Sequence, residues 1–250
     1  MLQELSPLLD RKSFISRRLA SDCFAKAFDE ADRLLALGFE HQIRSLMDNI
    51  RPDRQVLLFS ATFSPRVERL AGALLENPVR IQVGTSGSSN TNVTQRVVVL
   101  GDKSQKWDYL VRILPSLAAE GMLIVFVNCK AGAEELAMNL NKYASCGTVL
   151  CLQGDMDQTD RSNAVANFKK GAARVLVATD VAARGLDISG VKNIVNFDCA
   201  TSIDGHVHRV GRTARGENEG AALTLVTTRH DRDFAAHLCL NLEQSNQLVP

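Results

Sequence analysis

From about residue 53 onward, short runs of β-branched and aliphatic residues alternate with segments of helical periodicity. The expected strands are residues 56–59, 79–83, 95–100, 123–127, 148–152, 174–178, 192–197 and 221–226. Several of these runs are continuously apolar, as expected for strands that are buried on both faces of a sheet. Strands that alternate with helices predict βαβ units around a parallel sheet, so the expected fold class is α/β.

Two apolar stripes at helical spacing predict helices that pack against such a sheet. They are formed by Ile43, Leu46, Met47 and Ile50, and by Trp107, Leu110, Val111 and Leu114. A further helix is expected to begin after Ser64, because serine is a favoured N-cap and Pro65 suits the first helical position.

A segment rich in Gly and Ser, residues 84–92, has no apolar side chain. This composition predicts a flexible linker between two domains. We therefore expect an N-terminal piece at residues 29–83, a linker at residues 84–94, and a C-terminal domain at residues 95–250 that is long enough for its own core. Residues 1–28 show neither clear periodicity nor convincing strands, and they form an atypical N-terminal segment.

The composition is that of an ordinary globular chain, with 45% hydrophobic residues and a formal net charge of +1. This small net charge excludes a positive field over the whole chain. Any binding of nucleic acid must therefore depend on local basic patches. The apolar runs are too short to cross a bilayer, and the N-terminus lacks the apolar core of a signal peptide.

The cysteines have no C-x-x-C spacing, which disfavours a zinc site and indicates buried thiols in a reducing, intracellular compartment. They are Cys23, Cys129, Cys146, Cys151, Cys199 and Cys239.

Two polar motifs lie in the N-terminal piece. Asp29, Glu30 and Asp32 place three carboxylates in four positions before a Leu-rich segment. Acidic residues also gather at helix starts, where they complement the helix dipole, so this motif alone has a structural explanation. Ser60 and Thr62 follow the apolar run at residues 56–59, at the strand end where open α/β sheets bind ligands.

Two more polar motifs follow expected strands of the C-terminal domain. Gly154 lies in the sequence Gln-Gly-Asp, and Gln158 and Arg161 then share one side of the next helix. Residues 175–187 read VLVATDVAARGLD, a buried strand that leads to Thr179, Asp180, Arg184, Gly185 and Asp187. These residue types suit phosphate and ribose recognition, although a strand, a helical turn and a glycine stop explain the same pattern.

Residues 208–215 read HRVGRTAR and place Arg209, Arg212 and Arg215 at intervals of three after an expected strand. Arginine is always ionised, and its planar fork of donors suits phosphate. The motif is therefore a candidate phosphate clamp or arginine-finger site whose side chains converge on one anion. A solvated helix face is the alternative explanation for such a run of charge.

In this order across a linker, the five motifs resemble those of the DEAD-box RNA helicases. The likeness covers residues 29–242 and implies the truncated end of a first RecA-like domain, which binds ATP, followed by a complete helicase C-terminal domain. The sequence GDMDQ at residues 154–158 and the segment at residues 241–243 are similar to a branch associated with splicing.

The resemblance implies three groups of site residues. The catalytic residues are Asp29, Glu30, Arg212 and Arg215, and Asp29 would hold Mg²⁺ on the phosphates of ATP. The residues that couple the nucleotide to domain closure are Asp32, Ser60, Thr62, Asp187, His208 and Arg209. The residues along the RNA backbone are Gly154, Gln158, Arg161, Thr179, Asp180, Arg184 and Gly185.

The resemblance further implies ATP and Mg²⁺ as cofactors and RNA as a partner that is bound without reading its sequence. The similarity to the splicing-associated branch implies spliceosomal or other ribonucleoprotein partners and residence in the nucleus rather than the cytoplasm. We expect a monomer that does not associate with membranes.

Several residues depart from the pattern that the resemblance leads us to expect. The sequence contains no G-x-x-x-x-G-K-[ST] element, which is the loop that cradles phosphates. Lys26 interrupts the apolar strand expected before Asp29, and burying an unpaired ammonium is costly. Gln153 stands where His is common, Ala214 where Gly is usual, and Gly205 where an aromatic residue is usual. We expect the Ala214 methyl to be tolerated if the backbone there is not left-handed.

Two hypotheses follow. In the first, the chain is part of an ATP-dependent RNA helicase, and alone it does not hydrolyse ATP because the phosphate-binding loop is missing. In the second, it is a catalytically inactive RecA-like module or fragment that binds RNA or protein.

Overall fold

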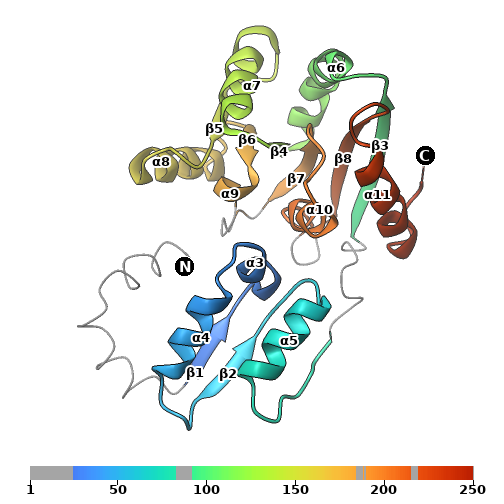
Figure 1. Cartoon of the computed structure of the whole chain (residues 1–250). Helices are drawn as coiled ribbons and strands as arrows, with labels where there is room; N and C mark the ends of the chain where they lie inside the picture. Colours follow the sequence, from blue (N-terminus) through green and yellow to red (C-terminus); the bar gives the residue numbers. More distant parts are fainter. Residues whose placement is uncertain (1–24, 83–91, 184–187, 189, 215–218, 250) are drawn as a thin grey trace. The chain divides into compact units, whose positions relative to one another are not determined.

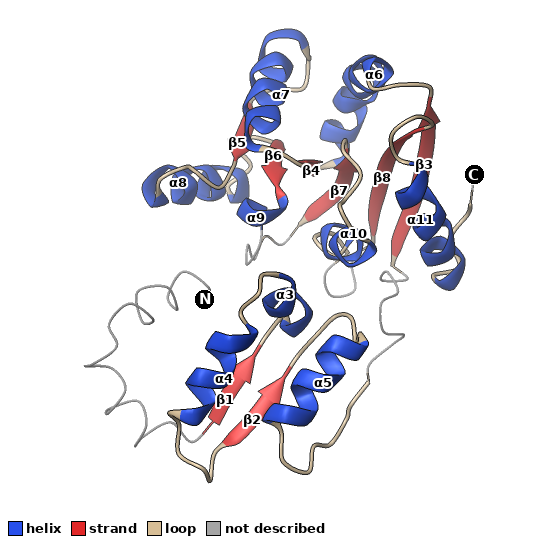
Figure 2. Ribbon diagram, viewed as in Figure 1, coloured by secondary structure: helices blue, strands red, loops and turns tan. Residues whose placement is uncertain are grey.

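The computed structural model describes residues 25–82, 92–183, 188, 190–214 and 219–249. The chain divides into two compact units, residues 1–87 and 88–250, and each unit has its own sheet. Element labels follow Figure 1, and Figure 2 shows the same view coloured by secondary structure.

The first unit is built on a two-stranded parallel sheet. β1 (Ala25–Phe28) pairs with β2 (Gln55–Leu58), and Phe28 lies opposite Leu58. The helices α3 (Ala31–Ala36), α4 (Glu40–Asp48) and α5 (Pro65–Leu74) pack apolar side chains against these strands. α5 begins as predicted, because the Ser64 hydroxyl accepts a hydrogen bond from the Val67 amide at 3.4 Å.

The second unit is a six-stranded sheet in the order β3-β8-β7-β4-β6-β5, and every neighbouring pair is parallel. The strands are β3 (Val93–Leu100), β4 (Met122–Val127), β5 (Val149–Leu152), β6 (Val175–Thr179), β7 (Val191–Asn196) and β8 (Gly220–Thr227). The α/β class and the parallel sheet predicted from the sequence are confirmed.

Helices cover both faces of this sheet (Figure 2). One face packs against α6 (Ser104–Glu120) and α7 (Lys130–Tyr143). The other packs against α8 (Gln158–Lys169), α9 (Asp180–Ala183), α10 (Ile203–Val210) and α11 (Arg232–Gln244). The neighbouring strands β4 and β6 are followed by helices on opposite faces, which makes their carboxyl ends a topological switch point, the usual ligand-binding position in such sheets.

Side-chain amides occupy backbone positions on both edge strands. At β5, the Asn141 carboxamide donates to the Val149 carbonyl at 2.8 Å and accepts from the Val149 amide at 2.9 Å. At β3, the Gln247 Oε1 accepts from the Gln95 amide at 2.8 Å. Both edges of the sheet are therefore partly closed by side chains rather than by another strand.

One expected strand is wrong. Residues 79–82 form no strand, and Val83, the last residue of the expected strand, lies outside the described residues. Val79 and Ile81 are 85% and 82% exposed. β-branched residues favour strands only where neighbours pack against them, and no pairing strand is found for this segment within the described parts of the chain.

Two expectations about single residues also change. Lys26 lies within β1, but its side chain is half-buried, so the cost of a fully buried ammonium does not arise. Ala214 has φ 52°, in the left-handed region, so the condition under which its methyl would be tolerated is not met. A non-glycine residue there is strained by about 1–2 kcal/mol.

Candidate functional site

The first two carboxylates of the acidic motif lie where β1 ends and α3 begins. The exposed Asp29 accepts a hydrogen bond at Oδ1 from the Glu30 amide at 2.9 Å. Glu30 has φ 53° and ψ 49°, a left-handed conformation that costs a non-glycine residue about 1–2 kcal/mol. Backbone strain of this kind clusters at functional sites, so the turn marks this strand end as a functional candidate.

The structure brings Asp32, Ser60 and Thr62 together at the carboxyl ends of β1 and β2. The buried Asp32 accepts two hydrogen bonds at Oδ2, from the Thr62 hydroxyl at 2.8 Å and the Thr62 amide at 3.0 Å. The Asp32 amide donates to Ser60 Oγ at 3.2 Å, and that hydroxyl donates to the Thr62 carbonyl at 2.6 Å. Two motifs whose residues lie 28 to 30 positions apart are therefore joined by hydrogen bonds, two of which are accepted by a buried carboxylate.

Arg209 connects three strand ends of the second unit. Its side chain is 1% exposed and donates to both carboxylate oxygens of Asp180, at 2.6 and 2.8 Å. It also donates to the Asp198 carbonyl at 2.6 Å and to Asn128 Oδ1 at 2.7 Å. The guanidinium lies over the ring of Phe126, 5.2 Å from its centroid. Arg209 therefore links the carboxyl ends of β4, β6 and β7.

This environment corrects the expectation that three arginines converge on one anion. The four donated hydrogen bonds of Arg209 go to protein acceptors within a buried site, so Arg209 does not present its guanidinium to a ligand. Arg212 lies beyond the end of α10, is half-buried, and donates from Nε to the His208 carbonyl at 3.3 Å. Arg215 lies outside the described residues, as do Arg184, Gly185 and Asp187.

The loop between β5 and α8, together with α8 itself, carries three of the residues assigned to RNA. Gly154 is exposed in this loop, and Gln158 is exposed at the first position of α8. Arg161 lies on the same helix and donates from Nη2 to the Ala182 carbonyl at 3.0 Å, which ties α8 to α9.

Thr179 and Asp180 stand at the junction of β6 and α9. Thr179 is 5% exposed, and its hydroxyl has no hydrogen-bond partner among the described residues. Buried polar atoms are normally satisfied, so an unpaired hydroxyl at the carboxyl edge of a parallel sheet is a candidate ligand contact. Asp180 is held by Arg209 and is not such a candidate.

Two family models match parts of this chain. The DEAD/DEAH box helicase family matches residues 9–70, and the helicase conserved C-terminal domain matches residues 105–217. The chain is 48% identical over 222 residues to the ATP-dependent RNA helicase DDX42 of Xenopus laevis, covering 89% of this chain and 23% of that protein.

The chain belongs to the DEAD-box helicase family. The solved structure of S. cerevisiae Dbp5 bound to RNA and ADP BeF3 aligns with a TM-score of 0.84 at 26% identity, covering 98% of this chain and 62% of that one. The yeast DEAD-box splicing factor Prp28 aligns with a TM-score of 0.58 at 29% identity, covering 98% and 53% of the two chains. Both sheets thus belong to a RecA-like DEAD-box fold. The match to the DEAD/DEAH box helicases begins within the segment at residues 1–28.

The DEAD-box chain spans 23% of the length of DDX42 of Xenopus laevis. Among its helices within the described residues, none is both long and apolar enough to cross a membrane.

Asn128 is a residue of this DEAD-box chain that was not predicted from the sequence as a site residue. It follows the buried strand β4, accepts from Arg209, and donates from Nδ2 to the Cys199 carbonyl at 2.8 Å. A polar amide directly after a continuous apolar strand is the signal that could have found it, since this edge of a parallel sheet carries ligand and network residues.

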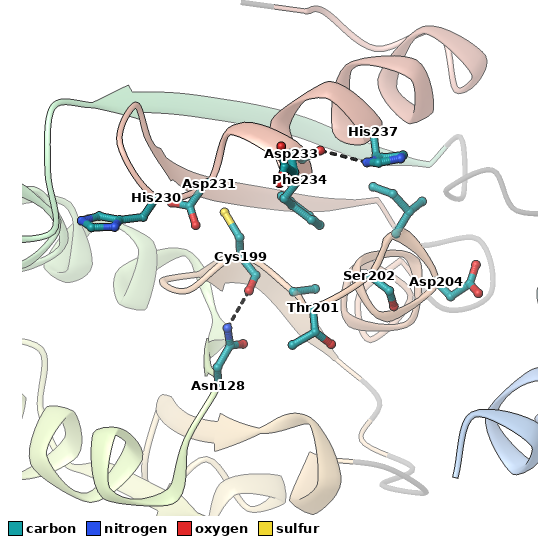
Figure 3. A pocket seen from close by; sticks show the side chains of 12 residues that line it. Asn128, Cys199, Thr201, Ser202, Asp204, His230, Asp231, Asp233, Phe234 and His237 are labelled. Atoms are coloured by element: carbon teal, nitrogen blue, oxygen red, sulfur yellow. Dashed lines mark hydrogen bonds between the residues drawn. The ribbon is translucent and has the colours of Figure 1, made fainter. Parts of the chain in front are cut away.

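Asn128 also lines a pocket of about 640 Å³, shown in Figure 3. The pocket lies between the loops that follow β7 and β8 and the start of α11. Cys199 and Phe234 point into it in Figure 3. The backbone carbonyl of Asp233 accepts a hydrogen bond from His237 Nδ1 at 2.8 Å if that nitrogen carries the proton. None of the residues predicted from the sequence as site residues lines this pocket.

The environments of the cysteine thiols and of the buried His206 are mainly those of structural residues. Burial raises the pKa of the Cys199 thiol to about 12 and that of Cys151 to about 11. Cys129 departs from the expected burial because it is the exposed N-cap of α7. Burial, reinforced by the charge of Arg209, lowers the pKa of His206 to about 4, so this imidazole is neutral at neutral pH.

Proposed function

We propose that this chain forms part of an ATP-dependent RNA helicase that remodels or locally unwinds RNA when ATP is hydrolysed. The observation that carries the proposal is the network of Asp32, Ser60 and Thr62. It joins the acidic loop that would meet the nucleotide to the loop after the neighbouring strand. A change at one loop would thereby be transmitted to the other, as the coupling of ATP to RNA requires.

The carboxylates at residues 29–30 fit a nucleotide-bound magnesium ion. Asp29 is exposed and offers hard oxygen ligands. No group of three or more potential metal ligands is found among the described residues, and Mg²⁺ is commonly bound by one or two carboxylates together with substrate phosphates. Bound there, Mg²⁺ would neutralise charge on the phosphates of ATP. Asp29 would hold the ion, and Glu30 would orient or deprotonate the attacking water.

In the second unit, the proposal assigns RNA contacts to Thr179, Gly154, Gln158 and Arg161. The unpartnered Thr179 hydroxyl and the exposed positions of Gly154 and Gln158 support this assignment. Backbone contacts of this type position a strand without reading its sequence. Arg184 and Gly185, which lie outside the described residues, stay in the same proposed group.

The remaining assignments concern the nucleotide. Arg212 and Arg215 would act as arginine fingers on the γ-phosphate, His208 would support domain closure, and Asp187 would lie near the ribose. Phosphoryl transfer depends on positioned charge, so arginines supplied by the second unit would make hydrolysis depend on closure. For Arg209 and Asp180 the buried ion pair favours a supporting role for both.

The second candidate function is a RecA-like module that binds RNA or protein without catalysis. It is favoured by one specific observation, the lack of a G-x-x-x-x-G-K-[ST] element in this sequence. Without that loop, we expect the chain alone neither to bind ATP tightly nor to hydrolyse it.

Two measurements test these proposals. RNA-stimulated ATP hydrolysis by this chain alone would contradict the expected inactivity. Titration with single-stranded RNA at several salt concentrations should give an affinity that falls as salt rises, because phosphate contacts release counterions. An absence of RNA binding at low salt would contradict the RNA-binding function under both candidates.

Cellular context belongs to the proposal as well. The alignment with the splicing factor Prp28 supports spliceosomal or ribonucleoprotein partners and a nuclear location. We propose a monomer. Sedimentation equilibrium of the purified chain and microscopy of a fluorescent fusion test these assignments.

A further inference from the structure

The loop between β5 and α8 is organised around the side chain of Gln153. This residue is 8% exposed. Its Oε1 accepts a hydrogen bond from the Asp155 amide at 2.5 Å, and its Nε2 donates to Glu134 Oε1 on α7 at 2.9 Å. One amide group therefore fixes the shape of the loop and attaches the loop to a helix.

A second attachment lies one helical turn away on α7. The ammonium of Lys130 forms an ion pair with the carboxylate of Asp155. Lys130 and Glu134 are four residues apart and so lie on the same side of the helix. This ion pair is largely exposed and contributes little, whereas the Gln153 amide is shielded from solvent. Gln153 is therefore the stronger of the two attachments.

The loop held in this way presents Gly154 at an open surface. A Cβ added at Gly154 would lie 3.5 Å from Lys130 Cε and 4.0 Å from Val181 Cγ1, with no backbone atom among its contacts. The position needs no glycine for its backbone angles, because its φ is not positive. Because this exposed glycine carries no side chain, another chain can approach the loop backbone closely.

We infer that Gln153 is a positioning residue for RNA. It holds the loop at residues 153–156 so that the backbone of Gly154 and the start of α8 contact one stretch of the RNA backbone. This inference rests on the proposed RNA-binding function and adds to it a residue that does not itself contact the RNA. Displacing the loop by even an ångström would separate contacts that must be made together.

The first test replaces Gln153 by leucine, which has a similar size and makes neither hydrogen bond. We expect the affinity of the full chain for single-stranded oligouridine, measured by fluorescence anisotropy, to fall about tenfold, the effect of losing one or two hydrogen bonds. Amide hydrogen exchange at Asp155, measured without RNA, should become faster in the same variant.

The matched control is Gln247→Leu, which removes another glutamine Oε1 that accepts a backbone amide, at the opposite edge of the sheet. We expect it to leave RNA affinity within a factor of two of the unaltered chain. Equal losses of affinity in the two variants would reveal a general loss of stability and would overturn the inference.

The second test uses Gln153→His and pH. A neutral imidazole can accept from the Asp155 amide and donate to Glu134, whereas an imidazolium has no acceptor. The charged groups that face it are Glu134, Lys130 and Asp155. We expect this variant to bind RNA as tightly as the unaltered chain does at pH 8. At pH 5.5 we expect it to bind RNA several-fold more weakly than the unaltered chain does, since histidine titrates near pH 6.5.

The outcomes separate the inference from the proposed function. If the unaltered chain binds RNA and Gln153→Leu binds equally well while folded, the inference is wrong and the proposed function stands. An affinity ratio between Gln153→His and the unaltered chain that does not change with pH would also contradict it. If the unaltered chain binds no RNA, the proposed function fails and the inference fails with it.

Discussion

Arg209 and Asp180 form a bidentate ion pair, with Nε 2.6 Å from Oδ1 and Nη2 2.8 Å from Oδ2, and the Arg209 side chain is 1% exposed. Asp180 begins α9, and Arg209 lies near the end of α10. The pair therefore holds two of the helices that follow the sheet at one fixed spacing. Its role is to position neighbouring residues rather than to bind a ligand.

We predict that Arg209→Lys destabilises the second unit by about 1.5–3 kcal/mol, because lysine keeps the positive charge but loses hydrogen bonds to a charged group. Lysine cannot reproduce the planar fork that reaches Asp180, Asn128 and the Asp198 carbonyl. Urea unfolding followed by circular dichroism measures the change. Arg232→Lys at the exposed start of α11 is the control and should alter stability by less than about 0.5 kcal/mol. Equal stability of the two variants would contradict the role assigned to Arg209.

We predict that Ala214→Gly changes the free energy of unfolding by less than about 0.5 kcal/mol. Glycine removes the left-handed strain at φ 52°, about 1–2 kcal/mol, but it also loses the buried methyl, about 0.8 kcal/mol, and has greater freedom in the unfolded chain. The comparison is Ala166→Gly, an exposed position within α8 that has no such strain to relieve, where the same change should cost about 1 kcal/mol. Thermal unfolding of both variants measures the two changes. A loss of stability at Ala214 as large as that at Ala166 would contradict the prediction.

We predict that Thr62→Val destabilises the first unit by about 1.5–3 kcal/mol, because the Asp32 carboxylate loses a hydroxyl donor at 2.8 Å. Valine keeps the shape of threonine, so the change isolates the hydrogen bond. Thr94→Val, at an exposed position of β3, controls for the substitution itself. Hydrogen exchange at amides of β1 and β2 reports the first unit separately from the second. Unchanged protection there would show that the network contributes no stability.

His206 gives a prediction about pH. Its pKa is lowered to about 4 by burial and by Arg209, whereas a histidine in an unfolded chain titrates near 6.5. Between these two pH values the unfolded chain binds more protons than the folded chain, so the free energy of unfolding rises with pH. As pH falls from about 6.5 toward 4, the free energy of unfolding decreases by up to about 1.4 kcal/mol per pH unit.

The measurement compares the pH dependence of unfolding with that of His206→Gln. Glutamine can keep a hydrogen bond to Gln95, which His206 contacts at 2.9 Å, but it does not titrate. We expect a smaller slope for the variant in this pH window. Identical slopes would exclude His206 as the titrating group.

Much of the fold was predictable because the signals are local. The apolar strands of the second unit and the start of α5 after Ser64 follow from side-chain pattern and capping. The error at residues 79–83 arose because strand preference depends on packing, and Val79 is 85% exposed. Family resemblance grouped Asp32 with Thr62, but it could not show that Arg209 is buried. That depends on Asn128, Asp180 and Asp198, which are brought to it by three different strands.

The left-handed backbone angle of Ala214 could not be predicted either, because the amino-acid sequence alone does not specify a backbone dihedral. Nor did the sequence identify Asn128 as an acceptor for Arg209, because the two residues are 81 positions apart. Both features emerge only from tertiary structure.

The amides of Asn141 and Gln247 have a consequence for how this sheet meets other chains. Each one occupies hydrogen-bonding positions that a seventh strand would need, so any strand added at either side must first displace a side chain. Growth of the sheet by recruiting a peptide or a second copy is thereby opposed at both ends. Replacing either amide would remove one obstacle to extension of the sheet at that edge.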